Sequence, residues 1–256
     1  VAERYPKMFH DDESIKIAAK LNVSHKDFNA MYQEYDRLVK IGRIVEIDKR
    51  VKQFIMRYAD GVIVNVGAEL DTMFSRMDNG RIRWYNVDMP EIMELRRKMV
   101  ESRDREQNIG KSILDFSWLD SVKKKPGEAI LFVCCDVTKY FTDKKLQAFL
   151  NAIWERFPGA EVLFDVKNSV GRKRANLKVL TGKKKGSFIK VSIDNCTSLM
   201  YDWNIKYRVL YDRAILNQED ITEMFSSDIA RKYRHAIRRK YDKIIQLRLG
   251  TERIEI

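Results

Sequence analysis

The sequence predicts an α/β protein with a doubly wound, mostly parallel sheet and a helical cap before it. Residues 1–60 show only helical patterns, and short apolar runs then alternate with further helical patterns. Alternating strands and helices require parallel crossover units, which is the basis of the fold prediction. A chain of 256 residues accommodates one large domain with a cap. We expect the cap over residues 1–60 and the sheet domain over 61–256, with a basic insertion near 167–190.

Three helices are predicted in the cap. The acidic run Asp11–Ser14 precedes an apolar helical pattern, as expected at the positive end of a helix. A second helix is predicted from about Lys26 to Val39 and a third from about Arg43 to Tyr58. The third has apolar residues at helical spacing, namely Ile44, Ile47, Val51, Phe54 and Ile55.

The sheet domain begins with the β-branched run Val62–Val66, which is typical of a strand buried on both faces. Further strands are predicted at Ile82–Val87, Asn108–Ile109, Ala129–Val133, Glu161–Phe164, Tyr207–Leu210 and Ile244–Leu249. Helices are predicted at Pro90–Glu101, Asp143–Phe157 and Asp228–Tyr241. The basic, glycine-containing stretches Gly171–Arg174 and Gly182–Gly186 are expected to form a mobile excursion between sheet elements.

Composition excludes several classes of protein. Hydrophobic residues make up 45% of the chain, which argues against a wholly disordered protein, and no apolar run approaches the ~18 residues of a membrane span. Three cysteines cannot build a disulfide framework and fit a reducing cytoplasm, while three scattered histidines lack zinc-ligand spacing. The net charge of +12 raises the possibility of nucleic acid, but no recognition motif is present.

The first strand and the one that follows it carry the signs of a nucleoside-binding site. Gly67 directly follows the first strand, and Asp88 ends the second about 20 residues later. A glycine lets the backbone approach a ligand, and an acidic residue at the second strand accepts hydrogen bonds from ribose hydroxyls. Alternatively, Gly67 only ends a strand and Asp88 only caps the helix at Pro90. The segment has one glycine where a dinucleotide fingerprint has three, which disfavours nicotinamide binding.

Motifs along most of the chain identify a resemblance. The string Val64–Thr72 resembles the VNLGAGLDT signature of the leucine carboxyl methyltransferase family, which includes tetracenomycin-type polyketide O-methyltransferases. The segment Trp84–Glu91 is similar to the W-Y-x-V-D-L-P-E block of that family. Further matches follow in order at Leu95–Arg97, Ser112–Trp118, Tyr140–Phe141, Phe157–Gly159, Phe164–Asp165 and Lys243–Gly250.

The resemblance implies a class I, Rossmann-like methyltransferase that uses S-adenosylmethionine (SAM). Such an enzyme would methylate a hydroxyl or carboxylate of a small, polyketide-like molecule. By motif position, Arg43 would pair with the methionine carboxylate of SAM, Gly67 would lie against its methionine portion, and Asp88 would bind the ribose hydroxyls. Ser112 and Ile113, with Asp115 nearby, would border the adenine. As alternatives, Arg43 is a solvated helix charge and Asp115 is a loop cap.

Two departures from the family pattern concern the cofactor site. Glu69 occupies the position of the second glycine of the signature, and Cys135 aligns with a glutamate of the family, with Asp136 following it. Glu69 either obstructs the cofactor or attracts the ammonium and sulfonium charges of SAM in place of the lost glutamate. We include both Glu69 and Cys135 among the candidate cofactor residues.

No catalytic residue is assigned from the sequence, because methyl transfer needs mainly positioning and, for a hydroxyl, a base. Asp136 and Tyr140 are placed near the acceptor only by their position after the fourth strand. We rank a SAM-dependent O-methyltransferase first and a catalytically inactive relative second. A nucleic-acid binder ranks third and a nicotinamide oxidoreductase fourth, and the sequence leaves the oligomeric state open.

Overall fold

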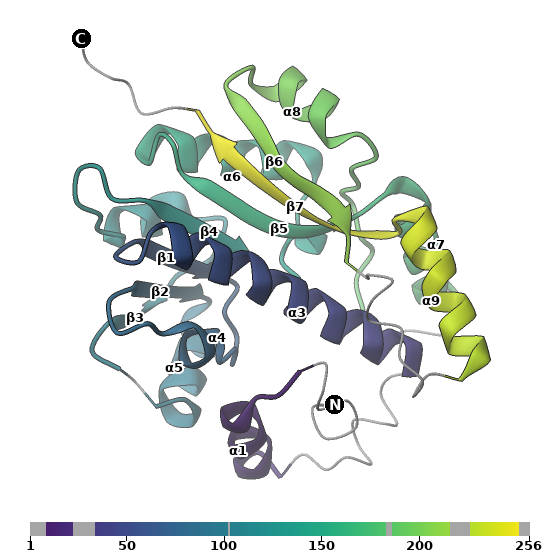
Figure 1. Ribbon diagram of the computed structural model, residues 1–256, viewed down its shortest axis with the longest axis horizontal. Helices are drawn as coiled ribbons and strands as arrows, with labels where there is room; N and C mark the ends of the chain where they lie inside the picture. The colour runs from purple at the N-terminus through teal and green to yellow at the C-terminus, as the bar shows by residue number, and fades with distance from the viewer. Residues whose placement is uncertain (1–8, 23–33, 102, 183–185, 216–225, 251–256) are drawn as a thin grey trace.

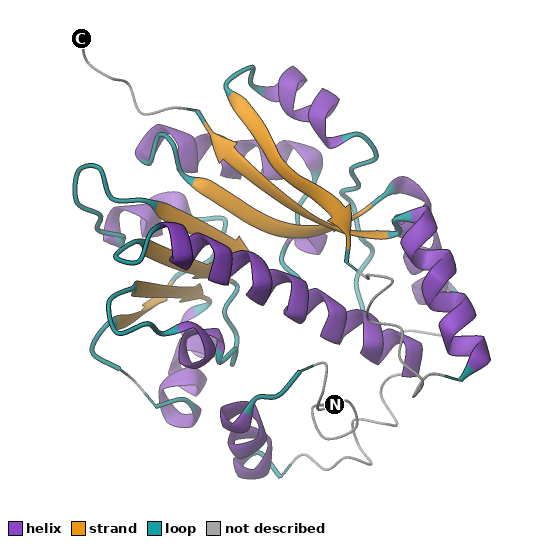
Figure 2. Cartoon of the chain, viewed as in Figure 1, coloured by secondary structure: helices purple, strands orange, loops and turns teal. Residues whose placement is uncertain are grey.

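A seven-stranded sheet forms the centre of the computed structural model, which describes residues 9–22, 34–101, 103–182, 186–215 and 226–250 (Figures 1 and 2). The strand order is β3-β2-β1-β4-β5-β7-β6; β7 runs antiparallel to both its neighbours, and the other neighbouring pairs are parallel. The strands are β1 (Val62–Val66), β2 (Arg83–Asp88), β3 (Glu106–Gly110), β4 (Ile130–Cys134), β5 (Glu161–Lys167), β6 (Tyr207–Ala214) and β7 (Asp242–Leu249). The predicted doubly wound α/β class is confirmed, although β5 and β6 continue several residues beyond their predicted ends.

The central strands are apolar because helices cover both faces of the sheet. Every residue of β1 and β4 is buried. The chain passes from β1 outward to β2 and β3, and then returns to place β4 on the other side of β1. In open α/β sheets, ligands bind outside the carboxyl ends of the strands where the order reverses in this way. We therefore expect a ligand site at the loops after β1 and β4.

Two apolar layers hold the helices to the sheet. On one face, Ile63 and Leu131 pack with α3 (Glu34–Arg57), α4 (Met73–Met77) and α9 (Ser227–Arg239). On the other face, Val64 and Phe132 pack with α6 (Asp143–Arg156), α8 (Cys196–Trp203) and the 3-10 segment η1 (Phe116–Ser121). The remaining elements are α1 (Asp12–Lys20), α5 (Pro90–Met99), α7 (Ser169–Leu180) and η2 (Thr138–Tyr140).

The predicted break between the second and third helices is wrong. A single helix, α3, runs without interruption from Glu34 to Arg57, and residues 26–33 of the predicted second helix lie outside the described residues. Gly42, which lies between the two predicted helices, is buried within α3. A helical glycine costs about 1 kcal/mol relative to alanine, which the apolar packing of a long helix easily exceeds. Continuity matters here because Arg43 is thereby fixed on a rigid element.

The stretch Gly171–Arg174, expected to be a mobile excursion, lies instead in α7. Asn168 caps this helix, since its side chain accepts a hydrogen bond of 2.7 Å from the Gly171 amide. Gly171 is buried against the backbone of Tyr241, and a Cβ at this position would lie 2.3 Å from the Tyr241 carbonyl oxygen. Gly171 is therefore a packing residue rather than a helix breaker. Residues 183–185 of the second basic stretch lie outside the described residues.

Polar contacts attach α1 to the start of α4. Asp11 caps α1, as the acidic run predicted, by accepting from the Ser14 amide at 3.0 Å. The same carboxylate accepts a hydrogen bond of 2.6 Å from Arg76 and pairs with the Thr72 hydroxyl. Arg76 also contacts both carboxylate oxygens of Asp48 on α3. Arg76 thus links α1, α3 and α4.

None of the helices in the described part of the chain is long and apolar enough to cross a membrane.

Candidate functional site

The turn after β1 requires a glycine. Gly67 has a φ of +71°, and its amide donates a 2.8 Å hydrogen bond to the carbonyl of Val87 in β2. A Cβ at Gly67 would lie 2.4 Å from a methyl group of Val137, which follows β4. Both the backbone conformation and the contact therefore exclude larger residues. The loops after β1 and β4 meet at the point where the strand order reverses.

Asp88, the last residue of β2, holds this turn in place. One carboxylate oxygen accepts a 2.9 Å hydrogen bond from the Glu69 amide, and the other accepts one of 2.7 Å from the Met89 amide. The structure thus brings Gly67, Glu69 and Asp88 together, as their motif positions suggested. A carboxylate oxygen has two lone pairs, so Asp88 keeps acceptor capacity for ligand hydroxyls.

The residues after β3 lie beside Asp88. The Lys111 amide donates to the Asp88 carbonyl at 2.8 Å, which places Ser112 and Ile113 just beyond the tip of β2. Asp115 is exposed and caps η1 by accepting from the Ser117 amide at 3.1 Å. Hydrogen bonds from Ser117 lower the pKa of Asp115. The loop-cap interpretation therefore describes the contacts of Asp115 in this structure.

Arg43 on α3 reaches the tips of β4 and β5. Its Nη1 donates to Asp136 at 2.6 Å and to Asp165 at 3.1 Å. Its Nε is buried and has no hydrogen-bond partner among the described residues. Lys139 donates to the other oxygen of Asp136 at 2.7 Å, and the Asp136 amide donates to Asp165 at 2.6 Å. Arg43 is therefore an ion-paired residue, which excludes the interpretation of a solvated helix charge.

The charges in this cluster divide into fixed and labile groups. Burial disfavours the Arg43 cation, but Asp165 and Asp136 outweigh burial and raise its pKa. Burial also acts against the Asp136 anion, yet Arg43 and Lys139 lower its pKa to about 2. For Asp165, burial prevails over Arg43, and its pKa is raised. Arg43 and Asp136 thus stay charged at neutral pH, whereas Asp165 is the group that a pH change affects most readily.

Glu69 and Cys135 occupy the two positions that depart from the family pattern. Glu69 adopts a left-handed conformation with a φ of +43°, which is unusual for any residue except glycine. Desolvation raises the pKa of Glu69, and the nearby negative charges of Asp136 and Asp88 raise it further, whereas the positive charge of Lys139 lowers it. These interactions show that the Glu69 carboxylate lies close to the charged cluster. Burial raises the pKa of the Cys135 thiol. Cys135 is therefore uncharged at neutral pH, and Asp136 supplies a fixed negative charge beside it.

Arg96 on α5 holds the loop after β1 through hydrogen bonds to its backbone. It was not predicted as a site residue. Its side chain is 1% exposed and donates to the carbonyls of Glu69 at 3.2 Å and Asp71 at 2.6 Å. The same guanidinium pairs with the buried carboxylate of Glu106 at 2.8 Å. Asp165 and Lys139 were also missed as members of the cluster. An acidic residue ending an apolar run, the signal that identified Asp88, is equally present at Asp165.

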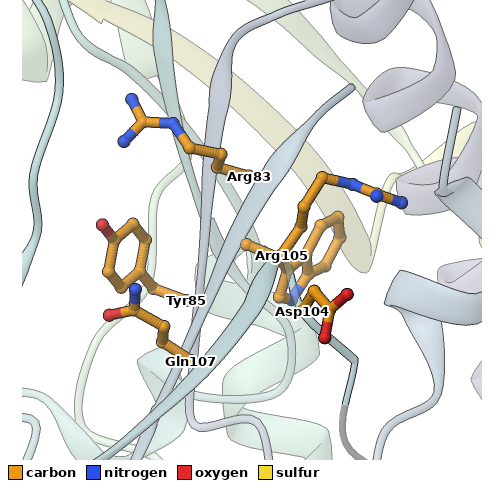
Figure 3. A pocket seen from close by; sticks show the side chains of 6 residues that line it. Arg83, Tyr85, Asp104, Arg105 and Gln107 are labelled. Atoms are coloured by element: carbon orange, nitrogen blue, oxygen red, sulfur yellow. The ribbon is translucent and has the colours of Figure 1, made fainter. Parts of the chain in front are cut away.

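A hollow lies where β2 and β3 begin, at the opposite ends of the strands from the candidate site (Figure 3). Its volume is about 110 Å³, and its lining consists of Arg83, Trp84, Tyr85, Asp104, Arg105 and Gln107. The side chains of Tyr85 and Gln107, opposite each other in neighbouring strands, lie side by side. Arg83 pairs with Glu128, and Arg105 pairs with Asp78 at 2.5 Å. This hollow is remote from the charged cluster and adds nothing to its chemistry.

Comparisons with known proteins show what the chain is similar to in sequence and in fold. No family model matches the chain, so the leucine carboxyl methyltransferase label rests on the motifs alone. The chain is 28% identical over 124 residues to the tetracenomycin polyketide synthesis O-methyltransferase TcmP of Streptomyces glaucescens. That match covers 48% of this chain and 45% of TcmP, so it spans less than half of the relative. The predicted resemblance to tetracenomycin-type O-methyltransferases is confirmed.

Solved structures share the fold at low sequence identity. One is the magnesium protoporphyrin IX methyltransferase ChlM of Synechocystis PCC 6803 with bound S-adenosylhomocysteine (SAH), at a TM-score of 0.54 and 9% identity, covering 97% of this chain and 94% of ChlM. Another is a DUF574 family protein of Streptomyces avermitilis, at a TM-score of 0.57 and 10% identity, covering 81% of this chain and 82% of that protein. The chain therefore has the fold of class I SAM-dependent methyltransferases, and half of it is similar in sequence to a polyketide O-methyltransferase.

Proposed function

We propose that this protein binds SAM outside the carboxyl ends of β1, β2 and β4 and transfers its methyl group to a small molecule. The acceptor would be a hydroxyl or carboxylate of a polyketide-like compound, in keeping with the sequence similarity to TcmP. The observation that carries the proposal is the glycine turn after β1, clamped to Asp88 where the strand order reverses. The free thiols of all three cysteines support a reducing compartment such as the cytoplasm.

The residues present fit the proposed cofactor. The unpaired Nε of Arg43 is a buried donor that a carboxylate would satisfy, and the guanidinium fork suits two oxygens. Asp88 would accept from the ribose hydroxyls, and the Gly67 turn would let the backbone lie against the methionine portion. Ser112, Ile113 and Asp115 would border the adenine. Glu69 and Asp136 would face the ammonium group, while the neutral Cys135 would contribute only contact.

The chemistry requires little of the protein beyond positioning. SAM, when bound, supplies a methyl group already activated by its sulfonium. A carboxylate acceptor needs no base, whereas a hydroxyl acceptor must lose a proton. Asp136 is a weak base, because Arg43 and Lys139 hold its pKa at about 2. Glu69 has a raised pKa and is the stronger base of the two. Since Glu69 is placed against the ammonium group of SAM, neither carboxylate is assigned as the base for a hydroxyl acceptor.

Calorimetric titration of the intact chain with SAM and with SAH tests the proposal. We expect saturable one-site binding of both ligands, because they share the carboxylate, ammonium and ribose groups that Arg43, the acidic residues and Asp88 would contact. Methyl transfer from labelled SAM to a panel of phenols and carboxylic acids then identifies the acceptor class. The absence of heat with either ligand would exclude SAM-dependent catalysis.

Replacing Glu69 separates its two possible effects on the cofactor. If its carboxylate attracts the sulfonium, Glu69→Gln weakens SAM binding by about 3- to 10-fold and SAH binding less, since SAH lacks the sulfonium charge. SAM affinity also falls as the pH drops through the raised pKa of Glu69, because protonation removes the negative charge. Titration of both ligands between pH 5 and 8 measures this. Tighter binding of SAM by Glu69→Gly but not by Glu69→Gln would instead show obstruction, because glutamine keeps the size of the side chain.

A catalytically inactive relative is the second candidate function. Two observations favour it, namely a non-glycine residue in the turn and the ion pairs that already occupy Arg43 Nη1. Such a protein would bind SAM or another ligand without turnover. Binding in the calorimeter without methylation of any phenol or carboxylic acid in the panel would support it over the enzyme.

A further inference from the structure

Two basic segments that are far apart in the sequence form one surface in the structure. Helices α7 and α9 lie next to each other at one end of the molecule (Figure 1). The Asn168 side chain at the start of α7 donates to the Arg239 carbonyl at the end of α9, at 2.8 Å. Arg174 lies over the ring of Tyr241, 5.0 Å from its centroid. We define the α7–α9 surface by the exposed residues Lys173, Arg174, Arg231, Arg234, Arg238, Arg239 and Lys240.

Most of these cations have no acidic partner among the residues that the structure describes. Within the described residues, the ion pairs of this surface involve Asp228, which contacts Arg231 at 2.7 Å near the start of α9. No ion pair joins the other six cations of the surface to a carboxylate in the described ranges. By contrast, Lys178 on the inner side of α7 pairs with Asp36 at 3.2 Å. Much of the net charge of +12 is thus concentrated on one end of the described part of the molecule.

The cations of α9 are arranged in a line. Arg231, Arg234 and Arg238 are spaced by three and four residues, so they share one helix face with axial rises of about 4.5 and 6 Å. A cavity of about 410 Å³ is lined by these three arginines and His235. The opposite face, with Ile229, Tyr233 and Ala236, is buried against the core. A row of guanidinium groups along a hollow matches an extended, regularly charged polymer.

We propose that the α7–α9 surface binds the phosphodiester backbone of a nucleic acid. Five of its seven cations are arginines, whose planar forks bind phosphate in a bidentate manner. Helix α9 exposes none of its large apolar side chains, whereas the centre of a protein–protein interface is apolar; Val170, Leu177 and Leu180 are exposed on α7, so we assign the phosphate contacts mainly to the arginines of α9. The proposal does not depend on methyl transfer, since it concerns α7 and α9 and not the loops after β1 and β4.

The surface borders the edge of the sheet that holds the candidate site. Helix α7 begins just after β5, and α9 leads directly into β7. Because Lys167 pairs with Asp242 in the antiparallel register, both helices meet the sheet at the carboxyl end of β5. Asp165, which contacts Arg43, lies two residues before that point. A bound strand would therefore pass close to the opening of the cofactor site.

Fluorescence anisotropy with labelled single-stranded RNA and a DNA duplex tests the proposal on the full chain without SAM. We expect binding that weakens steeply as salt rises from about 50 to 200 mM, with a slope of about −0.7 per RNA phosphate contacted. The triple variant Arg234→Gln, Arg238→Gln, Arg239→Gln should bind at least about 10-fold more weakly, with a shallower slope by about 2. The triple variant with lysine at the same three positions keeps the charge, so its affinity should show the same dependence on salt as that of the unmodified protein.

A control of equal charge loss makes the result specific to this surface. Arg97, Lys98 and Lys144 are exposed on α5 and α6, away from α9, and their replacement by glutamine should change binding by less than about two-fold. Equal losses of affinity in the two triple glutamine variants would show that binding depends on net charge alone, which would overturn the proposal. Tighter binding to polyglutamate or to phosphatidylserine vesicles than to the oligonucleotides would also overturn it.

Discussion

Arg96→Met is expected to lower the free energy of unfolding by about 3–5 kcal/mol at neutral pH. The substitution fills nearly the same volume but leaves the Glu106 carboxylate buried without its cation, which contacts it at 2.8 Å. It also leaves the carbonyls of Glu69 and Asp71 without the donor that holds them at 3.2 and 2.6 Å. Chemical denaturation monitored by circular dichroism measures the loss.

The neighbouring residue supplies the control for this prediction. Arg97 is exposed on the same helix, so Arg97→Met should change the free energy of unfolding by less than about 0.5 kcal/mol. Adding Glu106→Gln to Arg96→Met removes the unpaired charge and should restore part of the stability. If Arg96→Met unfolds like Arg97→Met, or if the double variant recovers nothing, the buried pair does not support the fold in this way.

Arg43→Met is expected to weaken SAM and SAH binding by about 10- to 100-fold, the range for losing charged hydrogen bonds to a ligand carboxylate. The substitution also removes the cation between Asp136 and Asp165. Burial already raises the pKa of Asp165, and the loss of Arg43 raises it further. The folded variant then binds a proton more tightly than the unfolded chain, so its stability falls as the pH rises through that pKa.

Calorimetry and thermal unfolding at pH 5.5 and 7.5 test both parts of this prediction. The melting temperature of Arg43→Met should lie closer to that of the unmodified protein at the lower pH. Lys49 is exposed on the same helix, so Lys49→Met should leave both ligand affinity and the pH dependence unchanged. Unaltered SAM affinity in Arg43→Met would show that Arg43 does not bind the cofactor. If SAM affinity falls as expected but stability does not depend on pH in the expected way, only the prediction for Asp165 is wrong.

The sequence predicted the fold wherever the pattern was local. Apolar runs such as Val62–Val66 identified the strands, since strands buried on both faces are apolar throughout. The break in α3 and the loop in place of α7 were wrong, and in each case a glycine lies where the helix was not predicted to continue. Gly42 and Gly171 are instead buried in helices, and only tertiary packing distinguishes these roles.

Residues of the candidate site could be predicted only where a predicted strand ends at a glycine or an acidic residue. Gly67 and Asp88 followed from this rule, and the turn between them agrees with it. The partners of Arg43 could not be predicted, because Asp136 and Asp165 lie 93 and 122 residues away and meet it only through the strand order. The role of Arg96 could not be predicted either, because Arg96 donates to backbone carbonyls, which every residue has.

The attachment of α1 differs in kind from that of α3. Helix α3 buries a long apolar face that includes Leu38, Ile47 and Phe54, whereas α1 buries a single residue, Ile17. Its contacts to Arg76 and Thr72 are polar, so salt and water compete for them. We therefore expect local opening of α1 to cost far less than global unfolding. Because Thr72 directly follows the turn that begins at Gly67, each such opening frees one end of the segment that surrounds the candidate site.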